Sequence, residues 1–247
     1  MKTILHTALC CGLALLCVPL LQAAEAAASS ARENAPYDLS GYWVALVTED
    51  WRFRMMVAPP GDYEGITLTA AGRALADSWE AEADLASGNA CKAYGAGGIM
   101  RMPTRLNIAW TSDNVLSVAT DAGRQNRVLK FGPAQDQIGI GSLQGVSHAR
   151  WDLQREGRGG PVVNGTLEVV TTRMAPGYLR RNGVPYSEQA RLTEYFELLP
   201  GEDGTDYLVV VSVLEDPIYL AQPVITSSSF RREADGSRWA PSECVVR

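Results

Sequence analysis

Apolar and polar residues alternate in short segments along most of the chain, and turn residues separate these segments. Alternation of this kind has the period of a β-strand that buries one face. It predicts strands over residues 41–48, 52–57, 105–110, 115–120, 127–131, 146–153, 166–172, 191–199, 207–214 and 224–231. Residues 200–205 place Pro, Gly and Asp between two of these strands and predict a hairpin turn.

A helical pattern stands out at one place in the chain. Ala71, Leu75 and Trp79 recur at near-helical spacing and predict a helix over residues 70–82. Thr69 directly precedes this segment and is a suitable N-cap.

Three further segments predict connections. Residues 88–103 are rich in Gly and predict an irregular crossover. The Asn164-Gly165 pair predicts a tight turn before the next strand, and residues 173–187 predict a loop.

About nine strands with mostly hairpin-length connections, together with one short helix, predict a mainly β protein. The expected fold is an antiparallel β-barrel or a sandwich, and the strand order stays open. Residues 37–247 are expected to form a single domain. Residues 27–36 are low in large apolar side chains and predict a flexible lead-in.

The first 26 residues predict a cleavable secretory signal peptide. Lys2 is followed by an apolar run over residues 4–21, and Ala24-Glu25-Ala26 fits the small-x-small pattern of signal peptidase sites. We expect cleavage after Ala26, and the alternatives are cleavage after Ala23 or Ala28. The alternative is a membrane anchor, since the run approaches the ~20 residues that span a bilayer. No basic cluster follows it, so we expect export to the periplasm or medium without stable membrane insertion.

Cleavage would leave two of the five cysteines, Cys91 and Cys244. Exported proteins keep disulfides, so we expect these two cysteines to pair; the alternative is a pair of buried free thiols. The net charge is −6, which argues against nucleic acid as a partner. Of the 22 basic residues only Lys2, Lys92 and Lys130 are lysines.

Short motifs carry two resemblances to known proteins. Gly41-Tyr42-Trp43 is similar to the Gly-x-Trp motif of lipocalins. Further stretches resemble a large group of exported bacterial proteins of unassigned function: Asp38-Leu39-Ser40-Gly41-x-Trp43, Leu68-Thr69-x-x-Gly72-Arg73-Ala74, Gly145-x-Ser147-x-x-Arg150-Trp151-Asp152, Leu192-Thr193-Glu194-x-Phe196 and Glu215-Asp216-Pro217. The second resemblance implies an exported, β-rich fold and no established reaction.

His148 is a candidate general base, because it is the only histidine that remains after cleavage. In a regular strand it shares a face with Arg150 and Asp152, so a carboxylate could orient its imidazole. The alternative is a surface histidine on a polar face.

Glu194 is the second candidate acid–base residue. It shares a strand face with Leu192 and Phe196, which predicts a carboxylate inside the barrel. Because a buried carboxylate needs a partner, we expect it to face a ligand or an arginine such as Arg150 or Arg105. The alternative is a solvated glutamate on an edge-like strand.

Arginine and aromatic side chains are the candidate ligand-binding residues. The segment 177–186 combines both types between two strands, a composition that suits aromatic or carboxylate ligands. The candidates are Trp43, Arg54, Arg105, Arg150, Tyr178, Arg181 and Tyr186. The alternatives are a solvated connector with anchored tyrosines, and tryptophans that belong to the core.

The sequence contains no metal-ligand cluster at usable spacing and no phosphate-binding loop, so no metal and no cofactor are expected. The favoured hypothesis is an exported small-molecule-binding β-barrel for an apolar or aromatic ligand, such as an acid. A cofactor-free lyase, isomerase or hydrolase that uses Glu194 or His148 is the first alternative. An envelope structural or interaction protein with a filled core is the second, and the oligomeric state stays open.

Overall fold

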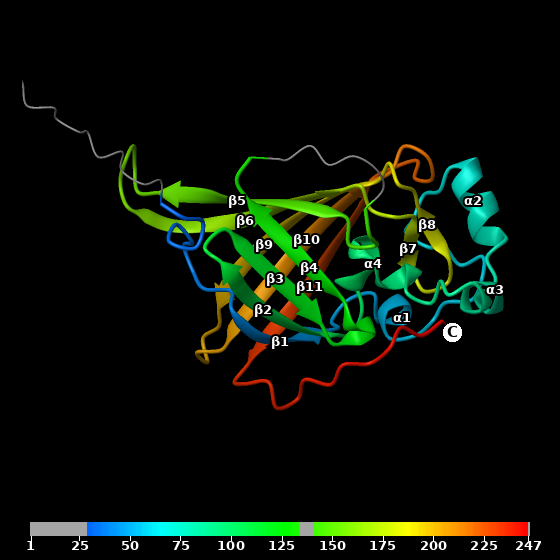
Figure 1. Ribbon diagram of the computed structural model, residues 1–247, viewed down its shortest axis with the longest axis horizontal. Helices are drawn as coiled ribbons and strands as arrows, with labels where there is room; N and C mark the ends of the chain where they lie inside the picture. The colour runs from blue at the N-terminus through cyan, green and yellow to red at the C-terminus, as the bar shows by residue number, and fades with distance from the viewer. Residues whose placement is uncertain (1–28, 134–140, 247) are drawn as a thin grey trace, which may run out of the picture.

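The computed structural model describes residues 29–133 and 141–246 (Figure 1). The predicted signal peptide lies outside the described residues, as do the first two residues of the predicted lead-in. Within the described part of the chain, no helix has the length and apolar character that crossing a membrane requires.

Nine strands form a closed barrel. They are β1 (Gly41–Leu46), β2 (Arg105–Ser112), β3 (Val115–Thr120), β4 (Asn126–Phe131), β5 (Val146–Arg155), β6 (Val162–Thr172), β9 (Arg191–Pro200), β10 (Asp206–Glu215) and β11 (Val224–Glu233). Around the barrel the order is β1-β11-β10-β9-β6-β5-β4-β3-β2, and β2 pairs with β1 to close the sheet. The predicted mainly β barrel is confirmed, and the closure excludes the sandwich alternative.

One strand pair departs from the antiparallel expectation. β4 and β5 run parallel, with Leu129 opposite Ser147 and Phe131 opposite Ala149. A parallel pair needs a connection of about a dozen residues or more, which hairpin-length loops do not provide. Residues 132–145 separate these two strands and supply that length.

Side chains from alternate strand positions fill the interior of the barrel. On β3, Leu116 and Val118 are buried, whereas Ser117 between them is less buried. Trp43, Phe196 and Phe230 are among the largest fully buried side chains and come from three different strands. The middle of the barrel is therefore a packed core, and a ligand site has to lie at one of its ends.

Short helices and a two-stranded hairpin cover one end of the barrel, at the right of Figure 1. They are α1 (Trp51–Arg54), α2 (Ala70–Asp77), α3 (Ala81–Ala86), η1 (Lys92–Tyr94), α4 (Ala96–Ile99), β7 (Gly177–Arg180) and β8 (Val184–Tyr186). β7 contacts η1 and α4, and β8 contacts α2. A further short helix, η2 (Ala122–Arg124), connects β3 to β4.

The predicted strand over residues 52–57 is wrong, because α1 occupies its first part. The amides of Phe53 and Arg54 both donate to the Asp50 carbonyl, at 2.9 and 3.0 Å, and close a helical turn. A strand here would need a free edge of β1 as its partner. β11 and β2 already occupy both edges of β1.

The predicted helix over residues 70–82 is interrupted, since α2 ends at Asp77 and α3 begins at Ala81. Thr69 Oγ1 accepts a hydrogen bond from the Gly72 amide at 3.0 Å, so the predicted N-cap is confirmed. A Cβ on Gly72 would lie 2.3 Å from the Tyr219 carbonyl oxygen. Glycine therefore allows α2 to pack closely on the connection between β10 and β11.

Two predicted connections contain strands. Asn164 and Gly165 lie within β6, opposite Gln154 and Leu153 of β5, so the predicted turn is wrong. The predicted loop over residues 173–187 contains the hairpin of β7 and β8. In both places pairing with a neighbouring strand outweighs the local preference for a turn.

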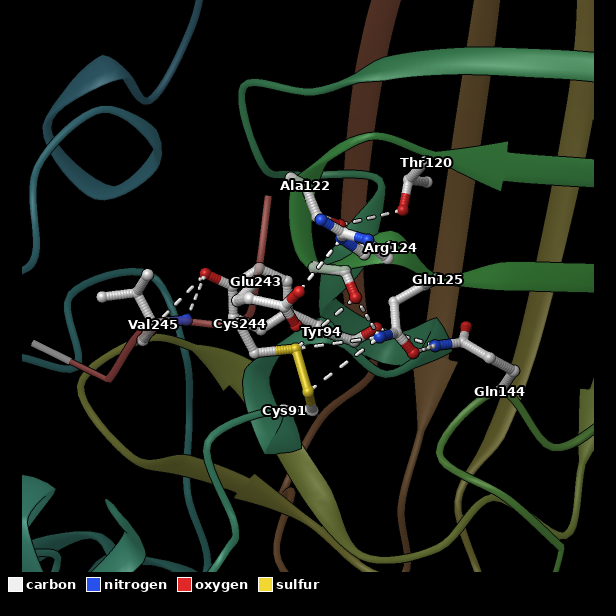
Figure 2. The surroundings of a disulfide bond; sticks show 11 residues. Cys91, Tyr94, Thr120, Ala122, Arg124, Gln125, Gln144, Glu243, Cys244 and Val245 are labelled. Atoms are coloured by element: carbon white, nitrogen blue, oxygen red, sulfur yellow. Dashed lines mark hydrogen bonds and ion pairs between the residues drawn. A yellow bond between two sulfur atoms is a disulfide. The ribbon is translucent and has the colours of Figure 1, made fainter. Parts of the chain in front are cut away.

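The predicted disulfide between Cys91 and Cys244 is confirmed (Figure 2). It joins residues 153 positions apart and holds the C-terminal tail against the segment that precedes η1. Next to it the Val245 amide donates to the Tyr94 hydroxyl at 3.0 Å. The tail is thus part of the folded domain.

The described part of the lead-in also contacts the barrel. The Ala31 amide donates to Asn114 Oδ1 at 2.8 Å, and the Trp151 indole donates to the Ala31 carbonyl at 2.9 Å. Hydrogen bonds therefore tie residue 31 to the turn after β2 and to β5.

Candidate functional site

A cavity of about 230 Å³ lies at the helix-covered end of the barrel. Its walls come from α1, α4 and β7 and from the ends of β9, β10 and β11. The volume is below the ~300–1,000 Å³ of typical ligand pockets, which suits a small ligand.

One side of the cavity is apolar. Its aliphatic lining consists of Ile66, Leu179, Leu192, Leu214, Val224 and Ile225. Leu192 lies at the start of β9 and Leu214 near the end of β10, and both belong to a second apolar cluster that joins the barrel end to the β7–β8 hairpin and forms the floor. Ile225 is 67% exposed at the rim. An apolar ligand could therefore enter without displacing the core.

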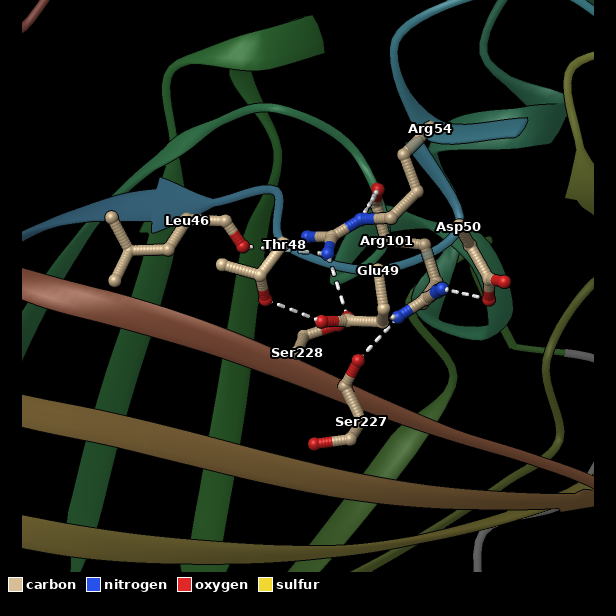
Figure 3. Close-up of polar contacts among 8 residues, drawn as sticks. All are labelled: Leu46, Thr48, Glu49, Asp50, Arg54, Arg101, Ser227 and Ser228. Carbon is tan, nitrogen blue, oxygen red and sulfur yellow. Dashed lines mark hydrogen bonds and ion pairs between the residues drawn. The ribbon is translucent and has the colours of Figure 1, made fainter. Parts of the chain in front are cut away.

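Arg54 and Arg101 also line the cavity and converge on Glu49 (Figure 3). Glu49 Oε1 accepts from Arg54 Nη1 at 2.9 Å and from Arg101 Nη1 at 3.1 Å. Arg101 Nη2 donates to Asp50 Oδ2 at 2.6 Å. Two guanidinium groups thus pair with two carboxylates, of which Asp50 lines the cavity, and their charges cancel.

Glu49 and Arg54 stay charged near neutral pH. Burial raises the pKa of Glu49, but the Thr48 hydroxyl and the guanidiniums of Arg54 and Arg101 outweigh it and hold the pKa below its usual value. Burial lowers the pKa of Arg54, whose ordinary value is far above neutral.

Arg180 is the cation of this cavity that no described carboxylate neutralises through an ion pair. Its guanidinium lies over the Phe53 ring, 3.7 Å from the centroid. Its Nη1 is buried and has no hydrogen-bond partner among the described residues. Burial lowers its pKa from a high ordinary value, so it remains a cation. Glu64 also lines the cavity, but Arg52 Nη1 contacts its carboxylate at 2.9 Å.

The chain matches no protein-family model, no curated protein and no solved structure. The resemblance to exported bacterial proteins therefore stays a prediction, and the function has to be argued from this geometry.

Four of the candidate ligand-binding residues lie at the same end of the barrel. Arg54 lines the cavity. Arg181 does not line this cavity, but its Nη2 donates to the Arg54 carbonyl at 3.0 Å. Tyr178 and Tyr186 line a second cavity between the hairpin and the helices α2 and α3. The segment 177–186 thus contributes residues to two neighbouring cavities.

The other three candidates lie away from the cavity. Trp43 is fully buried in the barrel core, and its indole donates to the Leu39 carbonyl at 3.0 Å. Arg105 pairs with Glu233 at 2.9 Å. The side chain of Arg150 is 68% exposed on the outer face of β5. The structure does not bring these three residues together.

His148 lies on the outward-facing side of β5, level with Lys130 of β4 and Val170 of β6. Its Nδ1 is buried without a hydrogen-bond partner among the described residues, and no described hydrogen bond joins it to Asp152. The neighbouring Ser147 is buried, and its hydroxyl lies 2.8 Å from the hydroxyl of Thr171. The expected pairing of His148 with a carboxylate is therefore not formed.

Glu194 is fully buried inside the barrel, which agrees with its position on an apolar strand face. Its partner is Arg127, not Arg150 or Arg105. Arg127 Nη1 donates to Glu194 Oε1 at 2.9 Å, and Nη2 contacts Oε2. Neither residue lines the cavity at the barrel end. A carboxylate with both oxygens bound to arginine is poorly placed to accept a proton from a ligand.

Sequence reasoning missed Arg101 and Arg180 as candidate site residues. Arg180 stands next to Arg181 in the aromatic and cationic segment, which was the available signal. On β7, Gly177 and Leu179 are buried, whereas Arg180 is half-buried and lines the cavity. Within the described residues, no group of three potential metal ligands is present.

Proposed function

We propose that this protein is an exported small-molecule-binding β-barrel whose ligand is a small apolar or aromatic acid. The ligand binds in the cavity at the helix-covered end of the barrel, with its carboxylate on Arg180 and its apolar body on the floor. The unpaired guanidinium of Arg180 is the observation that carries this proposal.

The Arg180 guanidinium lines the cavity without an ion pair to a described carboxylate. A ligand carboxylate on the cavity side of this guanidinium forms a charge-assisted hydrogen bond, which is worth about 1.5–3 kcal/mol. Leu179, Leu192 and Leu214 then bury the apolar part of the ligand.

The charges around the cavity also favour an acid with one carboxylate. Glu49 and Asp50 neutralise Arg54 and Arg101, and only Arg180 is left without an ion pair among the described residues. A second carboxylate on the ligand would face Asp50 and Glu64, which line the same cavity. The cavity therefore favours monocarboxylates over dicarboxylates.

The test is calorimetric titration of the purified protein with benzoate, phenylacetate and hexanoate, and with their neutral amides. Arg180→Met should weaken carboxylate binding at least about tenfold, because a hydrogen bond to a charged group is worth about 1.5–3 kcal/mol. Arg150→Met is the matched control, since Arg150 lies on the outer face of the barrel. Amides that bind as tightly as acids, or an Arg180→Met variant with unchanged affinity, would refute the proposal.

Export is the second part of the proposal, and the disulfide supports it because disulfides persist in oxidising compartments. The mass of the protein in the periplasmic fraction and in the medium tests it. Cleavage after Ala26 predicts a mature chain that begins at Ala27. A full-length chain that stays in the cytoplasmic fraction would contradict this part.

A further inference from the structure

A second cavity, of about 210 Å³, lies between the β7–β8 hairpin and the helices α2 and α3. Aromatic and proline side chains make up much of its lining: Trp79, Pro176, Tyr178, Pro185, Tyr186 and Tyr219. It shares no lining residue with the first cavity. A Cβ on Gly97 of the first cavity would lie 2.8 Å from the Tyr186 ring, so Tyr186 and Gly97 lie in the partition between the two cavities.

The second cavity contains a buried carboxylate, that of Asp84 on α3. Asp84 is 7% exposed, and its Oδ2 accepts from the Trp79 indole and from the Tyr178 hydroxyl, each at 2.7 Å. These two neutral donors orient the carboxylate and leave its negative charge in place. Burial and the bond to Asp84 raise the pKa of Tyr178, so this hydroxyl remains a donor.

The chain's own ammonium group occupies the remaining side of Asp84. Lys92 Nζ lies 3.4 Å from Asp84 Oδ1 and 5.5 Å from the centre of the Tyr178 ring. An ammonium between a buried carboxylate and an aromatic face is the arrangement that recognises organic cations. The contact is long, and the Lys92 side chain is 30% exposed, so its flexible stem can swing out to solvent.

The charges that line this cavity also favour a cationic ligand. Asp84 and Glu80 are its two carboxylates, and Lys92 is its one cation. Glu80 is exposed and forms no ion pair within the described residues. When Lys92 turns outward, the cavity therefore presents two negative charges and aromatic walls to a ligand.

We propose that this second cavity binds an organic ammonium ion with an apolar or aromatic body, and that Lys92 acts as an internal competitor for the cation position. The ligand ammonium replaces Lys92 Nζ beside Asp84 and Tyr178, and its body packs on Trp79 and Tyr219. This site is independent of the proposed carboxylate site, because the two cavities have different residues and opposite charge preference.

Calorimetric titration with phenethylammonium tests the proposal, in the wild type and in Lys92→Met, which keeps a similar length of side chain without the charge. We expect weak binding to the wild type and binding about tenfold tighter to the variant, because the internal ammonium no longer competes. 2-Phenylethanol, which has a hydroxyl in place of the ammonium, should gain nothing from the substitution. Lys130→Met is the matched control, since Lys130 is an exposed lysine on β4.

The indole N–H resonance of Trp79 locates the ligand, because this group donates to Asp84. It should shift on titration, and Asp84→Asn in the Lys92→Met background should abolish the binding if the variant keeps its near-ultraviolet circular dichroism. An unmoved Trp79 resonance, or equal affinity with and without Lys92, would overturn the proposal. Binding of phenylacetate that is lost in Lys92→Met would also overturn it, since Lys92 would then be an anion anchor.

Discussion

Replacing Glu194 by Gln removes the charge that balances Arg127 inside the barrel. Both side chains are completely buried. Besides Glu194, the guanidinium has only the Thr171 hydroxyl, at 3.3 Å, as a described hydrogen-bond acceptor, and its Nε has no partner there. The variant would therefore bury an uncompensated cation among apolar side chains.

The expected loss of stability is large for a single substitution that keeps the shape of the side chain. Removing one partner of a buried ion pair costs about 3–5 kcal/mol. For a domain of this size each kcal/mol lowers the melting temperature by about 2–4 °C, so a decrease of roughly 6–20 °C is expected. Because neither residue lines the carboxylate cavity, the folded variant should bind ligand with unchanged affinity.

Urea unfolding of the wild type, Glu194→Gln, Arg127→Met and the double variant measures this coupling. The double variant should lose less stability than the sum of the two single variants, since it leaves no unpaired charge. The matched control is Glu168→Gln, which removes the partner of Arg150 on the outer face and should cost at most about 1 kcal/mol. If Glu194→Gln cost no more than this control, water would reach the pair and the reasoning from burial would be wrong.

Two further predictions concern the tail and the tyrosines. The Cys91→Ser/Cys244→Ser variant should lose about 4–5 kcal/mol of unfolding free energy in urea, because the bond closes a long loop; a loss below about 1 kcal/mol would contradict the loop-entropy argument. Burial raises the pKa of Tyr37 and of Tyr63 to about 12, and at Tyr63 the hydrogen bond to Asp77 adds to the rise. A raised pKa in the folded state gives stability that is complete below the ordinary tyrosine pKa of about 10 and is lost as pH rises toward 12. Absorbance at 295 nm should show that these tyrosines ionise at a higher pH in the native protein than in 6 M guanidinium. A native titration curve that matches the denatured one would refute this.

Much of the barrel was predictable because strand alternation is a local property. Leu192, Glu194 and Phe196 point inward together, as their spacing requires, and all three are buried. The disulfide was predictable for a different reason, since the exported chain would retain only Cys91 and Cys244. Neither prediction depended on strand order.

The partner of Glu194 could not be predicted from alternation. On β4, Arg127 and Leu129 form one face while Val128 and Lys130 form the other, and each face combines an apolar and a basic residue. The two patterns are equally suitable for the inside. Pairing of β4 between β3 and the parallel β5 decides that Arg127 points inward and Val128 is exposed.

The candidate sites depend even more on long-range contacts. Arg180 meets Phe53 because the β7–β8 hairpin packs at the same barrel end as α1, which local patterning predicted as a strand. Asp84, Lys92 and Tyr178 come from α3, η1 and β7 and share no sequence motif. Sequence could name the residue types in segment 177–186, but not their positions in two different cavities.

The sequence by itself determined the period of the strands, the mainly β class and the cysteine pair, because each follows from neighbouring residues or from a count. The tertiary structure decided that the barrel closes, that Arg127 is the partner of Glu194, and that Arg180 has no ion pair with a described carboxylate. Those outcomes depend on strand register, in which a shift of one residue exchanges the inner and outer faces. They also depend on contacts between residues as far apart as Arg127 and Glu194, 67 positions from each other.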